Sequence, residues 1–326
     1  MISAFSVTAF GAAIAGAMAA YLLVMGVLAG KRIGFDRFLA FSLISVPLAF
    51  LLSRVVFVAG DLIGALGQSS YYLDTLESLR PTLWFWDGGY SLMGALLGLL
   101  LGLFLFRRYF AYPAGTLEDA FPAAFFLALF IERLAEPAST LGFGREVTSE
   151  FMLDHRLYLD LDGWPLLRVW RVEALIALIL FGLSIWQFFA LKKKGNAQIA
   201  RRQHLFLLFL AVFGFSQTFL ESLRDDGHMV VHFVRIQQVL ALFLGLSILA
   251  HALLQKRHEG LSGARVLLLA LLALMLTGLA VFSEFGVDRW GNRLLAYLVM
   301  ALCLGLLCVL TALLLRPHRD EGTVLS

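Results

Sequence analysis

The sequence predicts an all-α integral membrane protein, a polytopic helical bundle of about nine transmembrane helices. Of its 326 residues, 60% are hydrophobic and only 15% are charged, whereas a soluble domain carries about a quarter charged residues. A helix needs about 20 predominantly apolar residues to cross the hydrocarbon core of a bilayer. Such runs occur at residues 8–30, 38–66, 88–106, 117–135, 169–191, 205–223, 233–254, 264–285 and 294–315.

Taken in order, the spans differ in what accompanies their apolar residues. The first is rich in glycine and alanine, which suits close helix packing. Four of the spans carry polar residues that a bilayer disfavours, in chain order Arg54, Arg133, Glu221 and Gln238. The last two contain almost no polar residue except near their ends. We therefore expect a seven-helix domain over residues 1–258, with long non-cytoplasmic loops at 67–87 and 137–168, and an appended two-helix hairpin over residues 259–326.

Lysine and arginine gather in alternate loops, and this sets the expected orientation. They follow the first, third, fifth, seventh and ninth spans, as Lys31, Arg32, Arg37, Arg107, Arg108, Lys192, Lys193, Lys194, Arg201, Arg202, Lys256, Arg257, Arg265, Arg316 and Arg319. Such loops are cytoplasmic, which predicts the N-terminus outside and the C-terminus in the cytoplasm. These loops also account for the formal net charge of +3, so no nucleic-acid partner is expected.

The polar residues within the spans gather towards the outer side. Arg54 and Arg133 lie in the outer halves of their spans, and Glu221 and Arg224 share one helix face. Ionisable groups at such depth are costly unless they are paired or face water. Two interpretations stay open: a polar cavity that opens to the outer leaflet, or structural ion pairs between helices.

An arginine cluster at this depth suits a phosphate group. The planar guanidinium matches phosphate oxygens in pairs and stays charged, so an outer-leaflet phospholipid is the expected ligand. His228 and His232 are four residues apart, but the sequence offers no evident third metal ligand. We therefore expect neither a metal nor another cofactor.

Four stretches resemble the motifs of one enzyme family. They lie at residues 52–55, 86–98, 133–145 and 221–224, and Gln238 follows the last of them. Their order and spacing over roughly residues 1–255 are similar to those of the bacterial prolipoprotein diacylglyceryl transferases. That family moves the diacylglyceryl group of phosphatidylglycerol to a cysteine of exported prolipoproteins. The last two predicted spans exceed the family's usual seven.

The resemblance implies a set of site residues. Catalytic roles fall on Arg133, Glu221 and Arg224. Substrate-binding roles fall on Arg54, Gly88, Gly89, Gly94, Glu136, Gly144, Arg145 and Gln238. In the family reaction a thiol attacks a glyceryl carbon and a glycerol phosphate leaves, so fixed cations would stabilise the departing charge. Glu221 would take the thiol proton, or it would simply form an ion pair with Arg224 at i+3.

The sequence also departs from the family pattern at several positions. Met93 stands where the family has a histidine, Glu136 where it has an asparagine, and Gln217 where it has an arginine. Gln237 replaces the glycine before Gln238, and only Glu173 survives of a further motif. A protein with another acceptor, or a lipid-binding accessory protein without activity, is therefore the alternative to a transferase.

The glycine-rich third span has two readings of its own. Gly94, Gly98 and Gly102 recur every fourth residue, which lets helices pack closely; the resemblance instead makes this region the wall of a lipid site. A transporter is the weakest reading, because no inverted repeat or broken helix pair is evident. The expected location is the bacterial cytoplasmic (inner) membrane, with phosphatidylglycerol and an exported lipoprotein precursor as partners.

Overall fold

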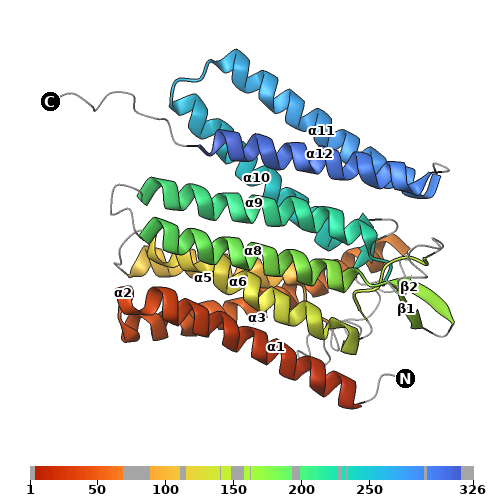
Figure 1. Ribbon diagram of the computed structural model, residues 1–326, viewed down its shortest axis with the longest axis horizontal. Coiled ribbons are helices and arrows are strands. Elements are labelled where there is room, and N and C mark those ends of the chain that lie inside the picture. Colours follow the sequence, from red (N-terminus) through yellow and green to blue (C-terminus); the bar gives the residue numbers. More distant parts are fainter. Residues whose placement is uncertain are drawn as a thin grey trace. The chain divides into compact units, whose positions relative to one another are not determined.

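The structure is a computed structural model of an all-α membrane protein (Figure 1). It describes residues 4–68, 89–110, 115–139, 141–147, 158–161, 163–192, 199–226, 229–231, 234–289 and 292–316. Most of the predicted loop 67–87, together with Gly88, His228 and His232, lies outside the described residues.

The helices follow the predicted spans closely. They are α1 (Ala4–Met25), α2 (Lys31–Ile33), α3 (Phe35–Gln68), α5 (Leu92–Tyr109), α6 (Thr116–Ala135), α8 (Val169–Lys192), α9 (Ile199–Leu223), α10 (Ile236–His258), α11 (Gly263–Arg289) and α12 (Arg293–Leu314). A π-helical turn, Gly26–Gly30, joins α1 to α2, and a 3-10 turn, Glu136–Ser139, follows α6. Two short antiparallel hairpins complete the described elements: β1 (Tyr158–Leu161) with β2 (Trp164–Leu167), and β3 (Val230–Val231) with β4 (Val234–Arg235).

Eight helices in the described part of the chain are long and apolar enough to cross a membrane. The predicted ninth span, 117–135, is present as α6, but this helix is not among the eight. It carries four charged residues near its two ends, Glu118, Asp119, Glu132 and Arg133, which lower its mean hydropathy. The direction in which the chain crosses the membrane stays a prediction.

The glycine repeat of α5 packs this helix against α3. A Cβ on Gly94 would lie 2.5 Å from the carbonyl oxygen of Leu52, and one on Gly102 would lie 2.7 Å from Ser45 Cα. At Gly98 a Cβ would meet the carbonyl oxygen of Leu48. Only glycine lets the two backbones approach this closely, so the repeat serves helix packing.

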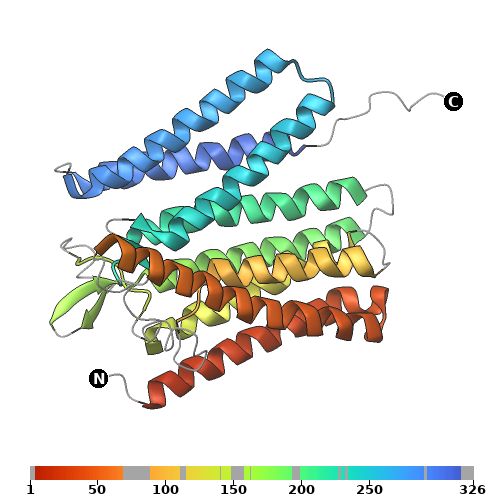
Figure 2. The ribbon, with the colours of Figure 1, turned by 180° about the vertical axis from the view of Figure 1, so that it is seen from behind.

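The described chain divides into two compact units. One comprises Met1–Gln187 with Leu220–Leu240, and the other comprises Phe188–Phe219 with Ala241–Ser326. Within the second unit, α11 and α12 run side by side as a hairpin in both views (Figures 1 and 2). The predicted division between residues 258 and 259 stays a prediction.

Candidate functional site

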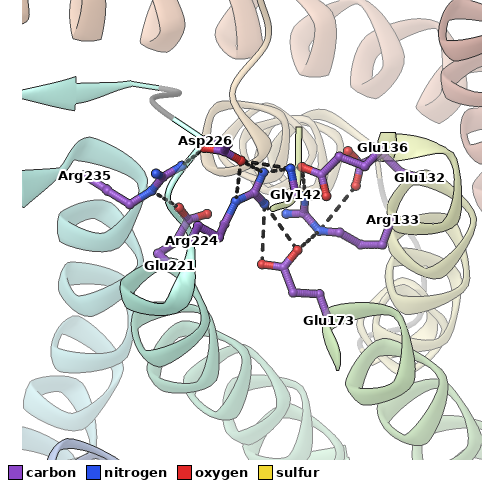
Figure 3. A network of polar contacts seen from close by, with 9 residues as sticks. All are labelled: Glu132, Arg133, Glu136, Gly142, Glu173, Glu221, Arg224, Asp226 and Arg235. Carbon is purple, nitrogen blue, oxygen red and sulfur yellow. Dashed lines mark hydrogen bonds and ion pairs between the residues drawn. The ribbon is translucent and has the colours of Figure 1, made fainter. Parts of the chain in front are cut away.

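A buried network of charged side chains joins the ends of several elements of the first unit (Figure 3). Arg133 lies in the last turn of α6, and Glu136 begins the 3-10 turn that follows. Glu173 comes directly after the first turn of α8, and Arg224 directly follows α9. These four side chains are 2–3% exposed. Helix ends that are far apart in sequence thus converge on one charged cluster.

The two arginines share the two carboxylates. Arg133 Nη1 donates to Glu136 Oε1 at 2.8 Å, and Arg133 Nε lies 3.0 Å from Glu173 Oε2. Arg224 Nη2 also pairs with Glu136 Oε1, and Arg224 Nη1 donates to Glu173 Oε2 at 3.2 Å. Each carboxylate therefore bridges both guanidinium groups, which fixes their relative position.

Asp226 and Arg235 extend the network. Asp226 Oδ2 accepts from Arg224 Nε at 3.0 Å and from Arg224 Nη2 at 2.7 Å, and Asp226 Oδ1 accepts from Arg235 Nη2 at 2.6 Å. Arg235 Nε donates to Glu221 Oε2 at 2.8 Å. Arg235 in β4 thus holds the carboxylate of Glu221 in α9. The guanidinium nitrogens of Arg224 donate to Glu136, Glu173 and Asp226.

Asp226 is held in its charged form. Burial raises the pKa of this carboxyl, but the positive charges of Arg224 and Arg235 and the hydrogen bond from the Gly142 amide more than reverse that effect. The net result is a pKa well below the usual range of an aspartate. Asp226 therefore acts as a permanent anion between two cations.

The network carries more negative than positive charge. Its members are the cations Arg133, Arg224 and Arg235 and the carboxylates Glu132, Glu136, Glu173, Glu221 and Asp226. Three cations against five carboxylates leave a formal excess of two negative charges when all are ionised. Glu132 lies at the edge: its Oε2 is 3.5 Å from Arg133 Nε, and its side chain is 23% exposed, whereas the other four carboxylates are at most 3% exposed.

A glycine-containing segment, residues 141–147, passes directly over the network. Gly142 has a φ of +81°, and its amide donates to Asp226 Oδ2 at 2.9 Å. A Cβ there would lie 2.9 Å from Glu136 Oε2. A Cβ on Gly144 would lie 2.6 Å from the carbonyl oxygen of Leu223. Both glycines are required by close approach, and Gly142 also by its left-handed backbone conformation.

A second cluster lies where α3 meets the start of α5. Arg54 Nη1 donates to the carbonyl oxygen of Gly89 at 2.8 Å, and its guanidinium carbon lies 5.4 Å from the centre of the Phe57 ring. Ser53 and Ser91 exchange hydrogen bonds, with the Ser53 hydroxyl 2.8 Å from the Ser91 carbonyl oxygen. The family-like stretches around residues 54 and 89 are therefore brought together by direct contacts.

The structure unites part of the predicted site. Arg133, Glu136, Glu221 and Arg224 belong to the buried network, and Gly144 forms a backbone bridge with Arg224. The other predicted site residues lie in different places. Arg54, Gly89 and Gly94 lie at the contact of α3 with α5, Arg145 lies in segment 141–147, and Gln238 is buried on α10.

Four charged members of the network, Glu132, Glu173, Asp226 and Arg235, were not predicted as site residues. Glu173 had a signal in the sequence, as the last residue of an otherwise altered motif. Asp226 lies only two residues after Arg224, but no motif marked it. Arg235 had no signal, because the fold of the β3–β4 region brings it to Glu221. Met93, at the position where a histidine was expected, is 1% exposed in α5. Its thioether cannot accept a proton from a thiol under ordinary conditions.

Comparisons with known proteins agree with the motifs. The family model of the prolipoprotein diacylglyceryl transferases matches residues 1–254. A phosphatidylglycerol–prolipoprotein diacylglyceryl transferase of Limosilactobacillus reuteri is 25% identical over 264 residues, which are 79% of this chain and 90% of that protein. Those of Listeria monocytogenes serotype 4b and Trichormus variabilis are 26% and 28% identical, covering 74% and 53% of this chain and 83% and 62% of the relatives.

Proposed function

This chain belongs to the prolipoprotein diacylglyceryl transferase family, and on that premise we propose that it transfers a diacylglyceryl group from phosphatidylglycerol to the cysteine of an exported lipoprotein precursor. The names of its relatives give the substrates of those proteins. The proposed location is the bacterial cytoplasmic membrane, with the reaction at its outer leaflet.

The proposed reaction is a displacement at carbon. The thiol sulfur attacks the glyceryl carbon that carries the phosphate, and the carbon–oxygen bond breaks. Its electron pair goes to the phosphate oxygen, which departs as glycerol phosphate. The thiol proton must pass to a base. The reaction therefore needs a cation at the departing phosphate and a proton acceptor near the sulfur.

The observation that carries the proposal is the arrangement of Arg133 in the buried network. Its Nη1 and Nε face Glu136 and Glu173, while Nη2 takes no part in these contacts. We assign Nη2 as the donor to the phosphate oxygen. Arg224 has Nε, Nη1 and Nη2 all directed at carboxylates, so we assign it the positioning of Glu136 and Glu173.

For the thiol proton, we propose Glu132 in place of the sequence-based choice Glu221. Glu221 is 1% exposed and ion-paired with Arg235, and an ion pair stabilises the charged carboxylate and weakens it as a base. Glu132 is the partly exposed carboxylate of the network. Its contact with Arg133, 3.5 Å between Oε2 and Nε, is longer than the 2.8 Å pair that holds Glu221. Its position on α6 next to Arg133 would place acid–base and phosphate groups side by side.

The remaining predicted residues receive binding roles in this proposal. Arg54 and Arg145 would attract the lipid headgroup, and Gln238 would line the substrate path. Gly89, Gly94 and Gly144 would act by allowing close backbone approach rather than by direct chemistry. Gly88 lies outside the described residues.

A binding or accessory role is the second candidate function. The observation that favours it is Met93, a buried thioether where the family has a proton-handling histidine. Glu136 adds to this, because it neutralises the two arginines that would otherwise attract a phosphate.

One experiment separates the two functions. Purified protein is incubated with labelled phosphatidylglycerol and a peptide that contains a lipoprotein cysteine motif, and the peptide mass is measured. A gain equal to one diacylglyceryl group supports the transferase. Lipid binding without any gain in peptide mass refutes it and supports the accessory role.

A further inference from the structure

The junction between β2 and α8 carries an unusual set of hydrogen-bond donors. Arg168 directly follows β2, and Trp170 and Arg171 lie in the first turn of α8. The junction is held in place by its backbone: Trp170 N donates to Gly142 O at 3.1 Å, and Gly144 N donates to Leu167 O at 2.7 Å. These backbone hydrogen bonds therefore fix the positions from which the side chains of the junction extend.

Two of these donors have no acceptor. Arg168 Nε and Trp170 Nε1 are both buried atoms, and neither has a hydrogen-bond partner within the described part of the chain. A buried N–H group without a partner is unfavourable. Both groups can only donate, so the partner that would satisfy them must be an acceptor.

The charges at the junction point to an anion. The guanidinium carbon of Arg171 lies 5.1 Å from the centre of the Trp170 ring. Burial lowers the pKa of Arg168, and the positive charge of Arg171 lowers it further, with a smaller opposite effect of Tyr158. Two like charges thus act on each other at the junction, and the first turn of α8 adds the partial positive charge of a helix N-terminus.

Among the described residues, the carboxylates of this region are occupied or turned elsewhere. Asp160 Oδ1 accepts from the Gly163 amide at 2.9 Å within the hairpin turn. Glu173, one turn further along α8, pairs with Arg133 and Arg224 in the buried network. Glu146 lies beside Leu166 through a backbone bridge and is exposed. The influences on Arg168 are therefore those of Arg171 and Tyr158.

From this geometry we propose that Arg168, Trp170 and Arg171 bind the phosphate of an anionic phospholipid headgroup. Arginine matches phosphate oxygens in pairs, and a tryptophan at the start of a membrane helix suits the depth of the headgroups. The proposal does not rest on the transfer reaction. If the transfer also occurs, a lipid held here would lie at the helix turn that carries Glu173 of the network.

The test measures lipid selectivity without any acceptor peptide. Protein in neutral detergent micelles is equilibrated with phosphatidylglycerol or phosphatidylcholine, and bound lipid is counted by native mass spectrometry. We expect the intact protein to prefer phosphatidylglycerol by about tenfold, the equivalent of one charge-assisted hydrogen bond. Arg168→Gln/Arg171→Gln should lower the preference to the level set by any lipid that Arg54, Arg133 and Arg145 hold. Trp170→Phe, which keeps an aromatic ring and removes only the N–H donor, should reduce it by about threefold.

The control neutralises a different pair of arginines, both exposed. Arg289→Gln/Arg293→Gln, at the last residue of α11 and the first of α12, should leave the preference unchanged. An unchanged preference in both the Arg168→Gln/Arg171→Gln and the Trp170→Phe variants would overturn the proposal and leave these residues as interfacial anchors only. Release of the lipid by millimolar inorganic phosphate would assign the site to a free anion and overturn the lipid assignment.

Because no turnover is measured, the outcome is independent of the proposed transferase activity. A protein that binds phosphatidylglycerol through this junction and transfers nothing would keep the lipid site and refute the enzyme. If the protein transfers the diacylglyceryl group and the variants keep the lipid preference, the enzyme is supported and the lipid site at this junction is refuted.

Discussion

Removing Arg133 should destabilise the protein more than removing Glu136, although the two groups form one ion pair of 2.8 Å. The reason is the excess of negative charge in the network (Figure 3). Arg133→Gln raises that formal excess from two to three and leaves Glu136 and Glu173 to share Arg224. Glu136→Gln lowers it from two to one and keeps an amide oxygen that both arginines can reach.

The expected magnitudes follow from burial. Breaking a buried ion pair by removing one partner costs about 3–5 kcal/mol when the remaining charge is left uncompensated, and this applies to Arg133→Gln. Glu136→Gln loses only the difference between a charged and a neutral acceptor, about 1 kcal/mol. At about 2 °C per kcal/mol, the two variants should unfold about 6–10 °C and about 2 °C below the intact protein.

The assay is thermal unfolding in one detergent at pH 7 and one heating rate, because unfolding of such a protein is under kinetic control. The double variant Arg133→Gln/Glu136→Gln should lose less than the sum of the single variants, since they share partners. Equal losses from the two single variants, or a larger loss from Glu136→Gln, would refute the reasoning from charge excess.

Three further predictions concern packing, proton transfer and pH. Gly98→Leu should prevent α3 and α5 from packing and abolish folded protein in size-exclusion chromatography, whereas Gly305→Ala, with open space around it, should fold normally; a folded Gly98→Leu protein would contradict the packing role. Glu132→Gln should slow transfer about 100-fold near pH 7, and the rate should recover towards pH 9, because the thiol then ionises by itself with a pKa of about 8.5. The control Glu118→Gln, at the other end of α6, should keep the normal rate. An equal loss of rate at every pH would mean that Glu132 is structural. The pKa of Asp226 is lower in the folded than in the unfolded protein. The stabilisation by its carboxylate is therefore complete above the unfolded pKa of about 4 and is lost as the pH falls below it. Asp226→Asn should flatten the acid side of a plot of unfolding temperature against pH, and an unchanged slope would contradict this.

The membrane helices could be predicted because hydropathy and length determine them locally. The predicted span 169–191 is α8 (Val169–Lys192), and 117–135 is α6 (Thr116–Ala135). The start of α5 was predicted less accurately. The predicted span begins at residue 88, but the helix begins at Leu92, because the Ser91 hydroxyl caps it by accepting from Gly94 N at 3.1 Å.

The network could be predicted only in part, because its contacts span long distances in sequence. The motif resemblance selected Arg133, Glu136, Glu221 and Arg224, yet Glu136 and Arg224 are 88 residues apart, and no spacing rule pairs them. Arg224 was the predicted i+3 partner of Glu221, and the two charges do interact. The fold adds Arg235, whose Nε donates to Glu221 Oε2 at 2.8 Å. The β3–β4 hairpin, whose two short strands leave no signal in the hydropathy pattern, brings Arg235 to Glu221 and Asp226.

The most direct test of the proposed enzyme compares the intact protein with Arg133→Lys in the peptide mass assay. Lysine keeps the positive charge but loses the planar fork, so one side chain cannot hold Glu136, Glu173 and a phosphate together. We predict a gain of one diacylglyceryl group by the peptide with the intact protein, and a rate at least about tenfold lower with the variant. No mass gain from the intact protein, or an equal rate with Arg133→Lys, would contradict the assignment of Arg133 to the transferase site.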